Sequence, residues 1–557
     1  MRALAEKHGR DLMQVWLGEL PAVVVSSPEA ARDVLRSQDL AFADRYVSTT
    51  IAAIYLGGRD LAFAPYGERW RQLRKLCTQR LLTAARVRSF RCVREEEVAR
   101  LVRDLAASAA AGEAVDLTAR VAELVNDVVV RCCIGGRRSR YRDEFLDALR
   151  TALDQTTWLT VADVFPSSKL ARMLGTAPRK ALASPRLRAL RRAEEVGALV
   201  RDLAASAAAG EAVDLTARVA ELVNDVVVRC CIGGRRSRYR DEFLDALRTA
   251  LDQTTWLTVA DVFPSSKLAR MLGTAPRKAL ASRKKMERIL EQIIQERKQI
   301  KERSTGAGAG ADDEAAAAGN ECFLDVLLRL QKEGDTPIPI TNETMMLLLH
   351  NMFSAGSETS STTLNWTMAE LIKSPRVMAK VHDEVRQAFQ GKNTITDDDV
   401  AKLSYLKMVT KESLRMHCPV PLLGPRRCRE TCKVMGYDVP KGTIVFVNAW
   451  AICRDSKYWK SAEEFKPERF ENISIDYNGN NFEFLPFGSG RRICPGITLG
   501  MANVEFPLAS LLYHFDWKLP NQMEPEEIDM REAPGLVGPK RTSLYLHHVT
   551  RVAPSSV

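Results

Sequence analysis

The chain has 557 residues, of which 46% are hydrophobic and 27% are charged. This balance is typical of a globular protein with a substantial core, and it excludes wholesale disorder. The formal net charge of +11 is compatible with nucleic acid, an anionic membrane face, an acidic protein partner or a merely solvated basic surface. No run of about 18 apolar residues occurs and no basic segment followed by an apolar stretch opens the chain, so neither a transmembrane span nor a secretory signal is expected.

The twelve cysteines are expected to be reduced thiols, because the chain lacks the signature of a secreted protein. Four of them form two Cys-Cys pairs, at 132–133 and 230–231. The nearest other pair, Cys428 and Cys432, has the wrong spacing for a Cys-x-x-Cys metal knuckle. We therefore predict neither a zinc site nor a disulfide framework.

The predicted elements begin with a β-branched run at 22–27, bounded by turns, which is typical of a strand. An internal repeat follows: residues 101–184 recur without a change as residues 199–282, an offset of 98. Genuine repeat architectures use diverged units of about 20 to 50 residues, so this repeat indicates a recent duplication or a flaw in the assembled gene. Runs such as 121–134 show the apolar spacing of helices. We expect one copy to dock in the fold and the other to be surplus.

After the repeat, residues 284–303 form a charged amphipathic pattern that predicts a helix. The small and acidic residues of 304–320 predict a flexible surface linker. From 341 to 374 the pattern is helical and ends against a proline, and at about 1.5 Å per residue this helix crosses a whole domain. A further helix is predicted over 405–417 and a strand over 442–450. Helix therefore dominates, and strands are few and scattered.

The glycine-bordered run FGSGRRICPG, residues 487–496, carries Cys494 directly before a predicted helix. The positive end of a helix and its free backbone N–H groups favour thiolate, the form of cysteine that ligates metal. On spacing alone, three interpretations stay open: a buried inert cysteine, a nucleophile, or a metal ligand.

Three other patterns place polar groups on helical faces. The long predicted helix contains SAGSETSSTT, in which an acid precedes a threonine hydroxyl. Taken alone, this pattern is also typical of an ordinary polar face of a helix. Glu412 and Arg415 stand three apart, where they can form a charge pair, and Trp70 and Arg74 stand four apart. An isolated pair of this kind is most often a surface salt bridge, so each motif says little by itself.

Taken together, these motifs resemble those of the cytochrome P450 family. The residues of its F-x-x-G-x-R-x-C-x-G haem loop are Phe487, Gly490, Arg492, Cys494 and Gly496. The other motifs follow in the family's order, so the resemblance covers essentially the whole chain apart from the extra block. It implies a mainly α cytochrome P450 fold, a single helix-rich domain with small β-sheets.

The resemblance also implies roles for individual residues. Cys494 is the axial thiolate of the iron of haem b, which pushes electron density toward bound oxygen and favours O–O cleavage. Glu358 and Thr359 lie in the oxygen-binding kink of the long helix and offer a proton route; many relatives carry aspartate instead of Glu358. The residues implied for haem binding are Trp70, Arg74, Arg426, Phe487, Arg492, Cys494 and Gly496. Those of the structural Glu-Arg-Arg cluster are Glu412, Arg415 and Arg469.

The implied reaction is the insertion of one oxygen atom of dioxygen into a hydrophobic small molecule, with electrons from NADPH through cytochrome P450 reductase and with no nucleic-acid partner. One alternative is an inactive haem-binding pseudoenzyme from a damaged gene. Another, a haem-thiolate enzyme that rearranges peroxides without dioxygen, is disfavoured by the presence of Glu358 and Thr359.

Longer phrases, such as APYGERWRQLRK and FLPFGSGRRICPG, are similar to plant A-type enzymes, especially the grass branch that oxidises terpenoids and other specialised metabolites. Members of that branch are anchored on the cytosolic face of the endoplasmic reticulum membrane by an N-terminal segment. The anchor and its proline-rich hinge are missing here, so we expect a chain truncated at its start.

We expect four mostly apolar segments to line the substrate pocket, and such a lining suits a hydrophobic substrate. These segments are 46–63, 352–359, 420–423 and 536–537. Basic residues near the haem loop, such as Arg491, are expected either to dock an acidic reductase or to be solvated charges.

Overall fold

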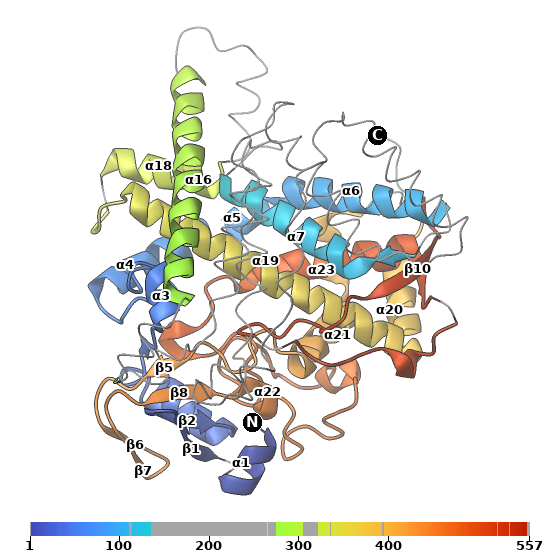
Figure 1. Cartoon of the computed structure of the whole chain (residues 1–557). Coiled ribbons are helices and arrows are strands. Elements are labelled where there is room, and N and C mark those ends of the chain that lie inside the picture. Colours follow the sequence, from blue (N-terminus) through green and yellow to red (C-terminus); the bar gives the residue numbers. More distant parts are fainter. Residues whose placement is uncertain are drawn as a thin grey trace, which may run out of the picture.

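The structure is a computed structural model, and it describes residues 2–9, 11–110, 114–134, 265, 275–304, 321–334, 336–392, 395–520, 522–533 and 535–553. A helix-rich region occupies most of the molecule, and a smaller region of strands contains the N-terminus (Figure 1). The predicted linker, from residue 305 on, and most of both repeat copies lie outside the described residues.

The strand region is built around a five-stranded sheet in the order β1-β2-β8-β5-β3. Its core is β2 running parallel to β8, although the two strands are more than 400 residues apart in the sequence. The runs predicted as strands over 22–27 and 442–450 contain β2 and β8. The strands of this sheet are β1 (Leu12–Leu17), β2 (Leu20–Val25), β3 (Asp44–Arg45), β5 (Arg426–Arg427) and β8 (Ile444–Val447).

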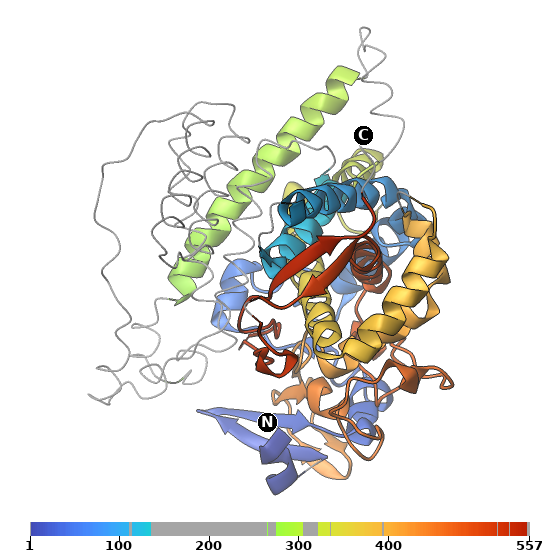
Figure 2. The ribbon, with the colours of Figure 1, turned by 90° about the vertical axis from the view of Figure 1, so that its right-hand side faces the viewer.

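Two smaller sheets complete the β structure of the described residues. One is a three-stranded sheet in the order β4-β10-β9 and the other is the hairpin β6-β7. Figure 2 shows β10 beside α6, far from the N-terminal hairpin. The strands are β4 (Val115–Asp116), β6 (Cys432–Val434), β7 (Tyr437–Val439), β9 (Phe515–Lys518) and β10 (Tyr545–Thr550).

Helices dominate the described chain, as the sequence predicts (Figure 1). Their bounds are α1 (Arg2–His8), α2 (Pro28–Arg32), α3 (Thr49–Ile54), α4 (Glu68–Leu76), α5 (Ala84–Ser89), α6 (Arg91–Ala110), α7 (Leu117–Ile134), α16 (Ala275–Ser304), α18 (Phe323–Glu333), α19 (Asn342–Lys373), α20 (Pro375–Ala388), α21 (Ser404–Met416), α22 (Ala449–Ile452) and α23 (Ile497–His514). No helix in these described ranges is both long and apolar enough to span a bilayer.

The helix α19 is the central element of the fold. It begins where the Thr341 hydroxyl accepts a hydrogen bond from the N–H of Thr344 (3.2 Å), and Pro375 stops it because the residue before a proline avoids helical geometry. It is buried along most of its length, since α7, α23 and α21 all pack against it. A helix enclosed in this way shows no one-sided apolar stripe.

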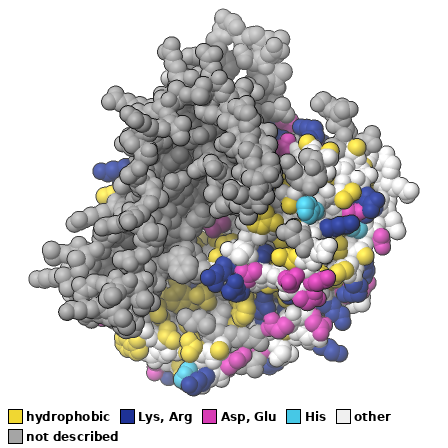
Figure 3. Space-filling model, turned by 45° about the vertical axis from the view of Figure 1, so that its right-hand side comes forward, with side chains coloured by type: hydrophobic (Ala, Val, Ile, Leu, Met, Phe, Trp, Pro, Cys, Tyr) yellow, Lys and Arg dark blue, Asp and Glu magenta, His cyan; other side chains and the backbone are white. Residues whose placement is uncertain are grey.

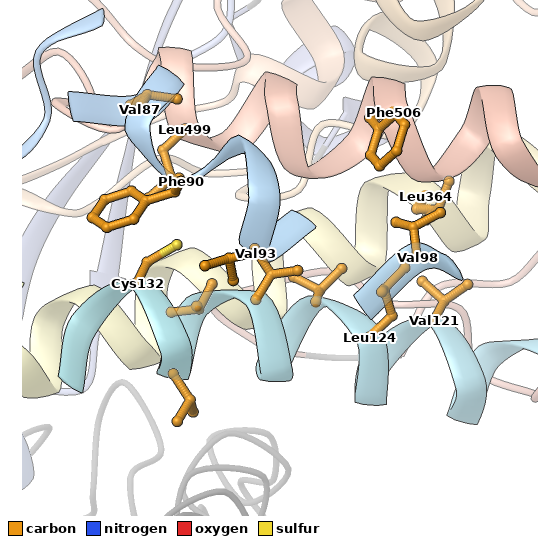
Figure 4. Close-up of a cluster of buried hydrophobic side chains, with 14 of the residues drawn as sticks. Val87, Phe90, Val93, Val98, Val121, Leu124, Cys132, Leu364, Leu499 and Phe506 are labelled. Carbon is orange, nitrogen blue, oxygen red and sulfur yellow. The ribbon is translucent and has the colours of Figure 1, made fainter. Parts of the chain in front are cut away.

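The main core lies where four helices meet (Figure 4). Val98 of α6, Leu124 of α7, Leu364 of α19 and Phe506 of α23 belong to one buried cluster. Each fully buried side chain of this kind contributes about 1.5–3 kcal/mol to folding. The core therefore holds α7 and α23 against the central helix and sets the position of the loop that precedes α23.

The two repeat copies contribute different parts of the described fold. The core helix α7 comes from the first copy, whereas α16 begins at Ala275, inside the second copy, and continues past the end of that copy. The parts of the copies at 135–264 and 266–274 lie outside the described residues. The first copy therefore supplies the core, and the second connects to the downstream chain.

The charged side chains on the face in Figure 3 are mixed rather than segregated. Lys and Arg side chains alternate there with Asp and Glu side chains. A mixed surface of this kind keeps a protein soluble without creating a strong field of one sign. On the coloured part of this face, no basic patch stands out.

Candidate functional site

The turn that carries Cys494 is held by its own backbone. It lies between a one-turn helix, Gly490–Arg492, and α23. The N–H of Cys494 donates to the carbonyl oxygen of Phe487 (3.0 Å), and the N–H of Gly496 donates to Sγ of Cys494 (3.4 Å). The sulfur thus lies at the N-terminus of an 18-residue helix, where the helix dipole and free N–H groups favour thiolate.

Gly490 is required for the close approach of this loop to the N-terminal part of the chain. Its φ is +71°, and a Cβ at this position would collide with the carbonyl oxygen of Leu35 and lie 2.8 Å from Oδ1 of Asp39. Glycine adopts this left-handed conformation without steric cost. A side chain here would push the Cys494 loop away from the segment that it packs against.

The pKa of the Cys494 thiol is set by opposing effects. Burial is the largest effect and holds this pKa above its ordinary value, whereas the hydrogen bond from Gly496 and the positive charge of Arg74 lower it in part. Arg74 comes from α4, so the cation that faces the sulfur is supplied by a segment far away in the sequence. Arg74 therefore favours the thiolate that a metal ligand must be.

A cluster of buried arginines lies on the same side of the molecule as this loop. Nε of Arg492 donates to the carbonyl oxygen of Ala43 (2.8 Å) and Nη2 donates to that of Ala64. Within the described part of the chain, Nη1 of Arg492 is buried and has no hydrogen-bond partner. A buried, unpaired N–H of a charged group is costly, so this atom fits an anion that approaches from outside the protein.

Arg426 also joins the cluster through backbone contacts. Its Nη1 donates to the carbonyl oxygen of Phe42 (3.2 Å) and its Nη2 to that of Ser489 (3.3 Å), just before the Cys494 loop. Its nearest carboxylate is Asp39, with Oδ1 at 3.6 Å from Nη1. The loop and the strand β5 are therefore tied together beside the cationic groups.

Sequence reasoning missed one member of this cluster, Arg45 of β3. Burial lowers its pKa well below the usual range, and repulsion from Arg426 and Arg492 lowers it further. Burial also lowers the pKa of Arg426 to about 10 and that of Arg492 to about 9. Burial is the main cause of all three lowered pKa values, and nearby carboxylates such as Asp39 beside Arg426 offset it only in part, which suits a ligand with carboxylates such as the two propionates of haem.

Trp70, one of the residues implied for haem binding, contacts the arginine cluster through its ring rather than through its indole N–H. Its Nε1 donates to the carbonyl oxygen of Leu61 (3.1 Å), so the indole N–H is already engaged. Its ring instead faces Arg492, with 4.3 Å between Cζ and the ring centroid. This is the geometry of a cation–π contact, and Trp70 therefore helps to hold Arg492 in place.

On the central helix, Glu358 and Thr359 lie in a short, partly accessible stretch. Ala355 is exposed, although the residues on either side of this stretch are buried. Thr359 Oγ1 donates to the carbonyl oxygen of Ala355 (2.7 Å), a bond that weakens the local helical ladder. Gly356 lies beside Val129 of α7, where a Cβ would make an ordinary contact of 3.5 Å with Cγ2 of Val129.

A tyrosine that sequence reasoning did not single out lies near this stretch. The ring of Tyr55, which follows α3, stacks on His350 of α19 with 4.9 Å between centroids and 20° between planes. Burial raises the pKa of Tyr55, and the charges of Asp60 and Glu358 raise it further. The phenol is thus close enough to Glu358 to sense its charge.

A cleft opens between α3, α16 and α19. It is lined mainly by apolar side chains, among them Ile54, Leu56, Met286, Leu290 and Leu347. Two of these residues belong to the expected pocket segment 46–63, whereas α16 was not expected to contribute. The expected segments 352–359, 420–423 and 536–537 do not line this cleft.

The Glu412, Arg415 and Arg469 side chains form one buried cluster. Nε and Nη2 of Arg415 donate to the two carboxylate oxygens of Glu412 (2.7 and 2.9 Å), and Nε of Arg469 donates to Oε1 of Glu412 (2.8 Å). Glu412 and Arg415 are completely buried. The cluster joins α21 to the one-turn helix Pro467–Phe470, so it holds together segments that are distant in the sequence.

A wider cleft, with a volume of about 550 Å³, lies at the C-terminal end of α19. Its lining includes Glu370, His417, Trp450 and Arg454. His417 Nε2 and Glu370 Oε1 are 2.6 Å apart. None of the residues expected to bind haem lines this cleft.

Comparison with known proteins gives consistent results. The family model for cytochrome P450 matches residues 1–183 and 180–546. An ent-isokaurene C2/C3-hydroxylase and an ent-cassadiene hydroxylase, both of Oryza sativa subsp. japonica, are each 53% identical over 557 residues, covering 100% of this chain and 88% of the relative. A dolabradiene monooxygenase of Zea mays is 46% identical over 556 residues, with 100% and 88% coverage. A solved zebra fish cytochrome P450 with abiraterone aligns with a TM-score of 0.63 at 21% identity, covering 99% of this chain and 97% of that one.

Proposed function

The chain belongs to the cytochrome P450 family and is a monooxygenase, and from this premise we propose that it inserts one oxygen atom of dioxygen into a terpenoid. The observation that carries the proposal is the Cys494 sulfur, which lies at a helix N-terminus within the electrostatic influence of Arg74, together with Arg45, Arg426 and Arg492, whose pKa values are lowered mainly by burial. The named relatives are hydroxylases and monooxygenases, and they do not support the alternative of an inactive pseudoenzyme.

The residues present fit haem b as the cofactor. Cys494 would hold the iron through Sγ, and Arg45, Arg426 and Arg492 would hold the propionates, with Nη1 of Arg492 as an available donor. When bound, the haem supplies the oxygen-activating chemistry. Phe487 would support the loop, since its carbonyl oxygen accepts the N–H of Cys494.

Glu358 and Thr359 would move protons on the opposite side of the site. The partly exposed carboxylate of Glu358 would take up a proton, and the hydroxyl of Thr359 would pass a proton on from Oγ1. In the structure this hydroxyl donates to the carbonyl oxygen of Ala355. A hydroxyl rotates readily, so the same atom is able to redirect its proton toward a reacting oxygen.

The proposed substrate class rests on the cleft and on the relatives. The hollow between α3, α16 and α19 has a volume of only about 20 Å³, so in this proposal its apolar side chains form one wall against which a hydrocarbon skeleton packs. The rice and maize relatives are named for ent-isokaurene, ent-cassadiene and dolabradiene. A terpenoid substrate is consistent with both observations.

We further propose NADPH-cytochrome P450 reductase as the electron source and the cytosolic face of the endoplasmic reticulum membrane as the location, both by relation to the family. Arg491, beside the Cys494 loop, is about half exposed and pairs with Asp39 (3.2 Å). Such a residue is able to contribute to a docking surface for an acidic partner.

One copy of the repeat is surplus in this proposal. The two matches to the family model, 1–183 and 180–546, meet at the end of the first copy. The described residues of the proposed site all lie outside 135–274.

The test is to express the full chain with haem and to record the carbon monoxide difference spectrum of the reduced protein. Thiolate ligation by Cys494 predicts the thiolate-type Soret shift, and Cys494→His should abolish it. Turnover with NADPH, reductase and a panel of diterpene olefins should give hydroxylated products. A wild-type chain that binds haem without the thiolate shift would exclude the proposed function.

A further inference from the structure

Two thiols that the proposed reaction does not use face each other in the strand region. The Sγ atoms of Cys428 and Cys432 are 3.8 Å apart. Cys428 is buried, whereas Cys432 is partly accessible. The ten cysteines that the structure describes are all free thiols, and this pair has its two sulfur atoms in hydrogen-bonding contact.

The β6-β7 hairpin creates this contact. Cys432 pairs with Val439 across the hairpin, and the thiol of Cys428 also reaches the carbonyl oxygen of Val439, at 3.8 Å. The backbone of Cys428 is fixed independently, because its N–H donates to the carbonyl oxygen of Thr443 (2.9 Å). Both sulfur atoms therefore approach the same strand, and they must move closer by about 2 Å to form a bond.

We propose that Cys428 and Cys432 form a reversible disulfide when the protein meets a peroxide. In the first step the Cys432 sulfur attacks the O–O bond of hydrogen peroxide, giving a sulfenic acid and one water molecule. In the second step the Cys428 sulfur attacks the sulfenic sulfur, forming the S–S bond and releasing a second water molecule. Two thiols are thereby oxidised by two electrons in total, and one peroxide is reduced to two waters.

The environment decides the order of these steps. Cys432 is the more accessible thiol, and the hydrogen bond that it receives from Cys428 lowers its pKa, although burial acts in the opposite direction and is the larger effect. Burial raises the pKa of Cys428 to about 12. Cys432 is therefore the thiol that peroxide reaches, and Cys428 is the resolving partner at contact distance.

The position of the pair gives the disulfide a consequence for the neighbouring arginine cluster. Cys428 follows directly on strand β5, which carries Arg426, and Arg429 lies between the two cysteines with its N–H donated to the carbonyl oxygen of Ala41. A crosslink between β5 and β6 restricts the unfolded chain. It should therefore stabilise the sheet edge that supports Arg426, and this inference does not depend on the reaction catalysed.

Trypsin provides a direct test, because Arg429 lies between the two cysteines. The full-length protein is treated with hydrogen peroxide, alkylated with N-ethylmaleimide, digested without reductant and analysed by mass spectrometry. We expect the peptides CR (428–429) and ETCK (430–433) to appear as one crosslinked species that dithiothreitol separates. We also expect the oxidised protein to have a higher Tm than the reduced protein.

Two variants define the outcome. Cys432→Ser should eliminate the crosslinked peptide and the rise in Tm, whereas Cys92→Ser, which removes another partly accessible thiol, should leave both. Recovery of both cysteines as alkylated thiols after peroxide treatment would overturn the proposal. So would irreversible oxidation of Cys432 with no crosslinked peptide.

Discussion

At the scale of single residues, the site depends on charges that are fixed by backbone contacts. Arg492 is 7% exposed, and two backbone carbonyls and the Trp70 ring hold it in place. The third nitrogen of its guanidinium group, Nη1, has no hydrogen-bond partner among the described residues. A guanidinium held in this way is ready to bind an anion without losing further side-chain entropy. Its neighbour in the sequence, Arg491, pairs with Asp39 (3.2 Å) but is about half exposed.

Arg492→Met should therefore weaken haem retention strongly. A hydrogen bond to a charged group contributes about 1.5–3 kcal/mol, so we expect roughly a 10- to 100-fold loss of haem affinity. The measurement is the rate and extent of haem transfer to an apo-globin acceptor. Arg491→Met is the matched control and should retain haem like the wild type; equal retention by the two variants would contradict the proposed role of Arg492.

Thr359→Ala should lower product formation relative to NADPH consumption. The lost hydroxyl is the group proposed to pass a proton on, and such groups contribute about 10²–10⁴-fold to rate; we expect a loss at the lower end of that range. Thr363→Ala, one turn further along α19, removes a hydroxyl that donates to the carbonyl oxygen of Thr359 (2.8 Å). In this control, product formation relative to NADPH consumption should stay as in the wild type. If this ratio falls equally in both variants, the effect belongs to the helix backbone rather than to the Thr359 hydroxyl.

At the scale of elements, charged side chains link segments that the core does not join. Glu412 of α21 binds Arg415, Arg469 and the N–H of Lys466 (2.9 Å) with a carboxylate that is fully buried. Every charge in this cluster has an opposite partner. Removing one charge from such a cluster leaves the others buried and unpaired.

Glu412→Gln should destabilise the fold by about 3–5 kcal/mol, the usual cost of breaking a buried charge pair. Urea unfolding followed by circular dichroism, at matched haem content, measures this change. Glu463→Gln is the control, because Glu463 is 57% exposed in its pair with Arg454 and should cost less than about 1 kcal/mol. A Glu412→Gln variant as stable as that control would show that the cluster does not hold α21 in place.

At the scale of the whole molecule, the repeat raises the question of which copy the fold uses. The two copies have identical local propensities, so sequence patterns cannot distinguish them. The structure distinguishes them by packing, because α7 of the first copy lies in the core with α6, α19 and α23 (Figure 4). The central helix cannot be covered without a copy of α7.

Deleting residues 185–282 should therefore preserve the site. Deleting 101–198 instead produces the same shortened chain, because the copies are identical. We expect the shortened protein to show the same carbon monoxide difference spectrum per haem as the full chain. Deleting 101–282 also removes α7 and should abolish haem binding; loss of the spectrum in the shorter deletion would show that the second copy is needed.

Several features of the fold and site were predictable because they are local. The cap and the proline end of α19 are a few residues long, and the predicted helix over 341–374 agrees closely with Asn342–Lys373. Roles that depend on distant contacts were less predictable. Nothing near Trp70 in the sequence shows that its N–H is taken by Leu61, and nothing near Arg45 shows that it lies beside Arg426 and Arg492.

The sequence by itself determined the reaction class through its resemblance to the cytochrome P450 family, because the residues of the Cys494 loop and the other motifs occur in the family's order. The turn and the helix start alone left a buried thiol, a nucleophile and a metal ligand open. Only the tertiary structure decided which cations surround that loop and which repeat copy covers the central helix. The physical reason is separation along the chain: the arginine cluster and the α7 packing join segments tens to hundreds of residues apart, and contacts at that distance leave no periodic pattern in the sequence.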